Sequence, residues 1–212
     1  MMEAPATTRL LLASCLEQGR HHIGQILLGV DFTLRHVADD DRDDLVLHTS
    51  PADARVIARY DAEGNFRPLK TAPNLKRGWL LEAGSLEGME LALEFFYPAA
   101  LGMWLSHLRV KLHPTALRET LDRQTGMYRI TQLIRDDQAS ELVARCCTSE
   151  GGCLRTILWD LAPGHPITTL PSSKLSLEEL PSNRIPLLCS ELCNLVVAAA
   201  RPIAKGNLPK KD

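Results

Sequence analysis

Apolar and polar positions alternate in the first part of the chain as a half-buried strand requires. Over residues 31–37 the order Asp-Phe-Thr-Leu-Arg-His-Val has a period of two. A short apolar run at 45–47 predicts a second strand. The sequence Ser-Pro-Ala-Asp at 50–53 is typical of a helix start, because serine can cap the backbone and proline suits the first helical position. We therefore predict a helix from there to about Tyr60.

Further along the chain the apolar positions take a helical spacing. The run 86–108 is long and apolar, and Pro98 interrupts it, so two helices or one kinked helix are expected. Helical spacing continues over 117–134 and resumes after 136, and a last apolar run predicts a helix from about 187 to 204. These patterns predict an α+β fold, with a small β-containing N-terminal part packed on a mainly helical C-terminal part.

The same patterns suggest how the chain is organised. We expect a lead-in over residues 1–22 and an α+β part over 23–135. A helical part would follow over 136–205, with a flexible tail at 206–212.

Composition excludes some classes of partner. A net charge of −2 gives no electrostatic reason to expect binding to nucleic acid or to an anionic membrane. No apolar run approaches the roughly 20 residues of a membrane span. We therefore expect a cytoplasmic protein without nucleic-acid or membrane partners. In a reducing compartment, clustered cysteines bind metal more often than they form disulfides.

The cysteines are the feature that points to specific chemistry. Five of the six lie in the C-terminal third, in two tight groups separated by thirty-five residues, whereas Cys15 lies far away. The two groups are Cys146, Cys147 and Cys153, then Cys189 and Cys193. This pattern predicts a four-ligand metal centre assembled from two segments, with one cysteine left over.

Spacing within the groups suggests how the sulfurs are presented. Cys189 and Cys193 are four residues apart, so a helix would place both on one face. Cys147 and Cys153 flank a segment that contains two glycines. Glycines let the backbone curl and bring N–H groups toward sulfur, and such hydrogen bonds tune the potential of a cluster.

The identities of the fourth ligand and of the metal stay open on spacing alone. Cys146 continues the inward apolar face of the predicted helix, whereas Cys147 is nearer the glycines, so Cys147 is favoured over Cys146. Five residues between Cys147 and Cys153 make a loose zinc knuckle. The usual C-x2-C-x2-C run of bacterial clusters is absent. Iron–sulfur is favoured, and zinc is the alternative.

Several short blocks together resemble the DR2241-type domain over about residues 20–205. In that family a four-cysteine [4Fe–4S] module is attached to a CbiX-like sirohydrochlorin cobaltochelatase. The resemblance implies that Cys153, Cys189 and Cys193, with Cys147 or Cys146, are ligands of a [4Fe–4S] cluster. The blocks that carry it are Arg67 to Leu75, Phe96-Tyr97-Pro98, Arg123 to Tyr128, Cys153-Leu154-Arg155, Leu158-Trp159 and Cys189 to Asn194.

The chain also departs from that family. By the resemblance, a chelatase of this class has a His-Gly motif after an early strand, and this chain contains no His-Gly. The first hypothesis is therefore an iron–sulfur protein with an electron-transfer, redox-sensing or accessory role, linked to tetrapyrrole metabolism and cobalamin biosynthesis. Its partner would be a redox protein or a chelatase-like protein.

Two alternatives come from other functional classes. One is a tetrapyrrole-acting enzyme that holds substrate carboxylates with the basic segment Arg67–Arg77 and with Arg123, because arginine forks suit carboxylates. No general base stands out, so no catalytic residue is predicted. The other is a structural zinc-binding interaction module.

Overall fold

The computed structural model describes residues 5–19, 21–110, 115–147, 152–160 and 183–207. The chain divides into two units, one formed by residues 1–112 with 179–188 and the other by 113–178 with 189–212. None of the described helices is long and apolar enough to cross a membrane.

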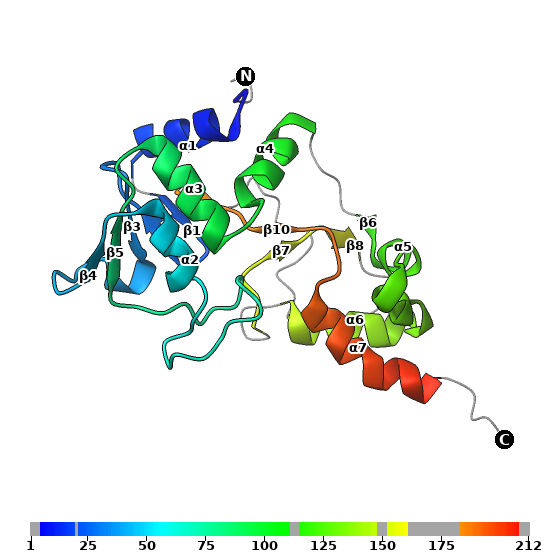
Figure 1. The fold of residues 1–212 in the computed structure, drawn as a ribbon. Coiled ribbons are helices and arrows are strands. Elements are labelled where there is room, and N and C mark those ends of the chain that lie inside the picture. Colours follow the sequence, from blue (N-terminus) through cyan, green and yellow to red (C-terminus); the bar gives the residue numbers. More distant parts are fainter. Residues whose placement is uncertain (1–4, 20, 111–114, 148–151, 161–182, 208–212) are drawn as a thin grey trace. The chain divides into compact units, whose positions relative to one another are not determined.

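The first unit is built on a six-stranded mixed sheet with the order β4-β5-β3-β2-β1-β9 (Figure 1). Its central strands β1, β2, β3 and β5 are antiparallel to one another, whereas β4 and β9 join the two edges in parallel. The strands are β1 (His21–Ile23), β2 (Ile26–Leu28), β3 (Thr33–His36), β4 (Val46–His48), β5 (Trp79–Glu82) and β9 (Arg184–Ile185).

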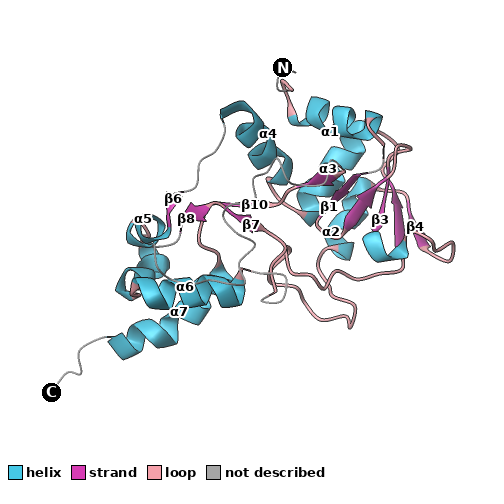
Figure 2. Ribbon diagram, turned by 180° about the vertical axis from the view of Figure 1, so that it is seen from behind, coloured by secondary structure: helices cyan, strands magenta, loops and turns pink. Residues whose placement is uncertain are grey.

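Helices pack on this sheet and on one another. Helix α3 contacts α1 and α2, and the ring of Phe96 on α3 stacks on Trp79 of β5 at 5.2 Å between ring centroids. Pro98 lies between α3 and α4, so the predicted interruption of the long apolar run is confirmed. Figure 2 shows these helices beside the strands. The bounds are α1 (Thr8–Glu17), η1 (Val37–Asp39), η2 (Pro51–Asp53), α2 (Ala54–Ile57), α3 (Leu86–Phe96) and α4 (Ala100–Val110).

The second unit is mainly helical and has a core of its own. Helices α6 and α7 pack together, and α7 also packs on the 3-10 helix η3. The bounds are β6 (Thr115–Ala116), α5 (Leu117–Asp122), η3 (Gly126–Leu133), α6 (Asp136–Cys146), β7 (Thr156–Ile157), β8 (Trp159–Asp160), β10 (Leu188–Cys189) and α7 (Asn194–Asn207). Its buried core includes Leu117, Leu121, Ile134, Leu142, Val143, Cys146, Cys147, Ile157, Trp159, Leu192, Val196, Val197 and Ala200.

The α+β fold class is confirmed, and three details differ from expectation. The units divide near residue 112 and not at 135, because Leu117, Leu121 and Ile134 belong to the same core as α6 and α7. The helix predicted to reach Tyr60 ends at Ile57. Residues 126–133 form a 3-10 helix, although their spacing suggested an α-helix.

The predicted final helix was placed too early. It was expected from about residue 187, but α7 begins at Asn194, and the preceding residues form the short strands β9 and β10. Strand pairing explains the difference, because Leu188 and Cys189 pair with β7 as strand β10 and are therefore extended. The helix continues to Asn207, into the segment predicted as a tail, whose residues 208–212 lie outside the described range.

The tight turn between β1 and β2 supplies a stability prediction. Gly24 has a φ of +57°, and a Cβ atom there would lie 2.5 Å from the hydroxyl of Tyr97, which accepts the N–H of Gln25 at 2.9 Å. We expect Gly24→Ala to lower the free energy of unfolding by about 2–4 kcal/mol, from the left-handed backbone and the steric overlap together. Urea denaturation measures this loss.

Gly64 is the matched control for this prediction. Its φ is +84°, and an added Cβ would meet nothing within 4 Å. Gly64→Ala should therefore cost only the backbone component, about 1–2 kcal/mol. Equal losses in the two variants would show that the contact with Tyr97 contributes nothing.

Candidate metal centre

The C-terminus of α6 presents two consecutive cysteines. Cys146 is the last residue of the helix, and Cys147 caps it, with its N–H donating to the carbonyl of Val143 at 2.8 Å. Both are buried in the core of the second unit. Successive residues on a helix point about 100° apart, so a single site at this helix end favours one of the two sulfurs over the other.

Cys153 lies in the segment that leads from this helix end to strand β7. It follows Gly152, whose φ of +95° is the left-handed conformation that glycine adopts without strain. This agrees with the curled backbone predicted between Cys147 and Cys153, although residues 148–151 lie outside the described part of the chain. Cys153 is buried.

Cys189 and Cys193 are not on one helical face, so that prediction was wrong. Cys189 belongs to strand β10, which pairs with β7, and its carbonyl accepts the N–H of Leu158 at 2.8 Å. Cys193 immediately precedes α7, where its carbonyl accepts the N–H of Val197 at 3.1 Å. The short pairing with residues 156–158 therefore brings the second cysteine group beside the first.

Side chains from three places hold the loop between these two cysteines. The carbonyl of Ser190 accepts from the indole Nε1 of Trp159 at 3.1 Å and from Arg123 at 3.4 Å. Arg123 also donates to the carboxylate of Glu191 at 2.6 Å. Tyr128 donates its hydroxyl proton to the side-chain oxygen of Asn194. The loop is thus positioned by the protein's own hydrogen bonds.

The thiols lie close enough to influence one another electrostatically. Burial raises the pKa of the Cys147 thiol, and the neighbouring Cys189, Cys153, Cys193 and Cys146 raise it further. Because the effects of all four converge on Cys147, this sulfur lies within electrostatic range of each of the others.

Cys189 has two hydrogen-bonding neighbours of its own. Burial raises the pKa of its thiol, and the guanidinium of Arg155, which lies beside the sulfur and hydrogen-bonds to it, acts in the opposite direction. The Cys189 thiol also donates to the carbonyl of Glu191 at 3.3 Å. A guanidinium at this position favours the thiolate, which is the form that binds metal.

This set of donors fits an iron–sulfur cluster. Four buried thiols and one partly exposed thiol belong to the second unit. Within the described residues, no group of three or more His, Cys, Asp or Glu side chains is arranged to hold a single metal ion. The fit therefore rests on the type of donor, since cysteine thiolates are the usual ligands of a [4Fe–4S] cluster and four of them hold it.

Sequence reasoning missed the residues that hold the cysteine loop and gave one of them another role. Arg123 was expected to bind substrate carboxylates, but it is paired with Glu191. Trp159 and Arg155 lie in the sequence blocks that resemble the DR2241-type domain, but no role was predicted for either residue. Their proximity to Cys153 in the sequence was the one signal that could have identified them.

Two basic side chains of the segment Arg67–Arg77 make hydrogen bonds within the chain. Arg67 is 4% exposed, and its guanidinium donates to the carbonyls of Ala58, Lys70 and Ala72 and to the side chain of Asn74. Lys70 donates to the carbonyl of Phe95 at 2.5 Å. These contacts use the Arg67 guanidinium and the Lys70 ammonium group to hold the irregular segment in place, as structural side chains.

Comparison with known proteins agrees with the arrangement. Residues 109–202 match the family model described as a 4Fe-4S iron–sulfur cluster binding domain, and residues 13–108 match the DR2241 stabilising domain. No curated protein matches the chain.

One similar solved structure is DR2241 from Deinococcus radiodurans. It is described as a multi-domain protein with structural similarity to chelatases and with two additional novel domains. The two sequences are 29% identical, the TM-score is 0.69, and the match covers 93% of this chain but 41% of that one. This chain therefore corresponds to less than half of that protein.

These matches decide between the two metals that spacing left open. The match of residues 109–202 to a 4Fe-4S cluster binding domain decides for iron–sulfur, and the cofactor of this chain is a 4Fe-4S cluster.

Proposed function

We propose that this chain is an accessory iron–sulfur protein that passes single electrons and works beside a chelatase-like protein in tetrapyrrole metabolism, including cobalamin biosynthesis. The ligands in this proposal are Cys147, Cys153, Cys189 and Cys193, and Cys146 is a buried core residue. A reducing cytoplasm suits a protein that keeps so many free thiols.

The all-cysteine donor set is the observation that carries this proposal. When bound, a [4Fe–4S] cluster supplies a one-electron redox couple. Four protein thiolates give every iron a protein ligand and leave no iron open to a substrate. The arrangement therefore favours electron transfer over Lewis-acid chemistry.

Residues around the sulfurs support a redox role. Arg155 at Cys189 places positive charge and a hydrogen bond at one ligand, and both features raise the potential of an iron–sulfur centre. Trp159 and Arg123 keep the loop at Ser190 in place. A ligand loop that is held in this way changes little in shape when the charge of the centre changes.

The accessory role is supported by the contacts that two arginines make within the chain. Arg67 is buried in structural contacts and Arg123 pairs with Glu191, so both guanidinium groups already have partners within the chain. The chelatase-like partner is suggested by the similarity of the longer relative to chelatases. A redox protein is the other partner to be tested.

Two measurements test the proposal. Anaerobically reconstituted protein should contain four irons and four sulfides per chain and give an electron paramagnetic resonance signal after reduction with dithionite. The same protein should not accelerate cobalt insertion into sirohydrochlorin above the uncatalysed rate. Cobalt insertion by this chain alone would show that it is the enzyme, and a colourless zinc-loaded protein would replace the redox role with a structural one.

A further inference from the structure

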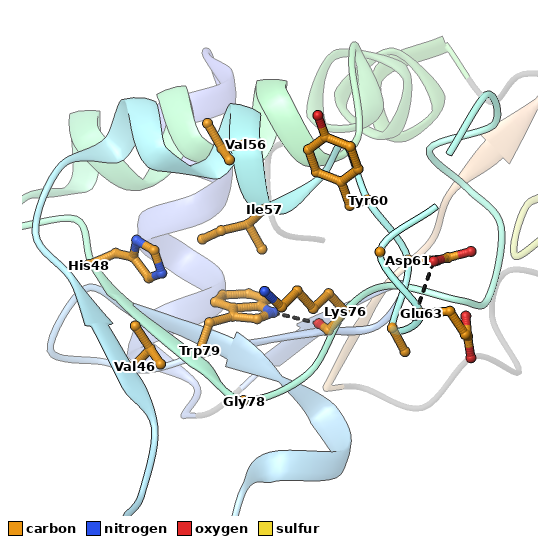
Figure 3. Close-up of a pocket in the computed structure, with 12 residues that line it drawn as sticks. Val46, His48, Val56, Ile57, Tyr60, Asp61, Glu63, Lys76, Gly78 and Trp79 are labelled. Carbon is orange, nitrogen blue, oxygen red and sulfur yellow. Dashed lines mark hydrogen bonds between the residues drawn. The ribbon is translucent and has the colours of Figure 1, made fainter. Parts of the chain in front are cut away.

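The first unit contains a cavity that the iron–sulfur function does not use. Its volume is about 580 Å³, and it lies between α2 and the beginnings of β4 and β5 (Figure 3). Most of its lining is apolar, and the side chains that form these walls are Val46, Val56, Ile57, Tyr60 and Trp79. A volume of this size is typical of small-molecule sites, which fall at about 300–1,000 Å³.

Trp79, which forms the floor of the cavity, is held in place by its contacts with the rest of the first unit. Trp79 is 2% exposed, its ring stacks on Phe96, and its indole Nε1 donates to the carbonyl of Lys76 at 2.6 Å. The next turn is fixed as well, because the N–H of Gly78 donates to the buried carboxylate of Asp39 at 2.7 Å. The apolar surface is therefore formed before any ligand arrives.

Lys76 supplies the available positive charge at this cavity. It is exposed, and its ammonium group makes no ion pair with any residue that the structure describes. His48, on another side of the cavity in Figure 3, has its Nδ1 3.6 Å from the carboxylate of Asp53.

Two acidic residues, Asp61 and Glu63, also line the cavity. The carboxylate of Asp61 accepts the N–H of Glu63 at 3.1 Å, and the backbone and side-chain N–H groups of Asn65 at 2.7 and 3.4 Å. These bonds build the turn at 61–65 and satisfy Asp61. Glu63 is exposed at the tip of this turn.

We propose that this cavity binds a small flat aromatic carboxylate. Its ring system would lie against the exposed side chains of Val46 and Val56, over the indole of Trp79, and its carboxylate would meet the ammonium group of Lys76. Aromatic rings gain from packing on an indole and on branched aliphatic side chains. A single lysine suits one carboxylate, whereas a polycarboxylate would need more cations than the cavity offers.

The test uses 2-naphthoate as the probe and the full chain with its cluster reconstituted. Binding is followed by NMR of the δ1 methyl group of Ile57, a wall residue. We expect a saturable shift of this methyl signal. The uncharged probe 2-naphthylmethanol should bind the same place about tenfold more weakly, since an ion pair of about 1.4 kcal/mol is missing.

Two variants separate the charge from the apolar walls. Lys76→Met should weaken naphthoate binding about tenfold and leave naphthylmethanol binding unchanged. Val56→Trp should weaken both probes at least tenfold, because Val56 is 62% exposed and a larger side chain there can fill the cavity without entering the core. The control for Lys76→Met is Lys205→Met, because Lys205 is an exposed lysine of α7. The control for Val56→Trp is Val110→Trp, because Val110 is 66% exposed on α4.

The results divide cleanly. Saturable binding that Lys76→Met and Val56→Trp weaken, and that the controls leave unchanged, supports the proposal. No saturable shift at Ile57, or binding that neither variant alters, overturns it. Equal weakening by the control variants would also overturn it, because the probe would then bind the surface without selectivity.

Discussion

Cys153→Ser, Cys189→Ser and Cys193→Ser are each expected to abolish retention of the cluster. Serine keeps the size of the side chain, but its hydroxyl has a far higher pKa than a thiol and is a poor ligand for iron. The iron content of anaerobically reconstituted protein should fall from about four per chain to near zero. Cys15→Ser is the control, because Cys15 belongs to the first unit and should have no effect.

The consecutive pair at the end of α6 sharpens this prediction. Cys147 lies in electrostatic range of the other four sulfurs, so Cys147→Ser should lose the cluster and Cys146→Ser should keep it. The opposite result would exchange the two assignments. If both variants kept the cluster, three cysteines would hold it and one iron would be open to substrate, which would favour an enzyme.

Trp159→Ala is expected to have the largest effect on the stability of the second unit. The side chain is completely buried in the core formed with α6 and α7. Its removal should cost about 3–5 kcal/mol, from lost burial and from the cavity that remains. Hydrogen exchange of the amides in α6 and α7, measured without cluster, reports this loss for the unit alone, which a global unfolding curve does not.

Trp159→Phe separates packing from the hydrogen bond to the cysteine loop. Phenylalanine keeps much of the ring but cannot donate to the carbonyl of Ser190, which the indole meets at 3.1 Å. We expect a loss of about 1–2 kcal/mol and faster removal of the cluster by a chelator. Trp104→Ala is the control, since Trp104 stacks on His107 in α4 of the first unit. If cluster release by the Phe variant matched that of the wild type, the indole bond would not hold the loop.

Local patterns predicted those elements whose boundaries are set by local chemistry. Pro98 separates α3 from α4 because proline cannot continue a helix, and Asp136 begins α6. Alternation over 31–37 predicted the strand observed as β3. The residues before α7 were misassigned because their apolar run is compatible with a helix, and only pairing with distant strands makes them extended.

The type of donor at the centre can be predicted from the amino-acid order, since five cysteines lie within forty-eight residues, from Cys146 to Cys193. The way in which these cysteines are presented depends on the folded backbone. Arg123 and Trp159, which are distant from Ser190 in the sequence, donate to its carbonyl, and Arg155 hydrogen-bonds to the sulfur of Cys189. Strand β9 likewise pairs with β1, although more than 150 residues separate them in the sequence. Periodicity reports which side chains are buried, but hydrogen bonds between distant segments depend on the path of the whole backbone.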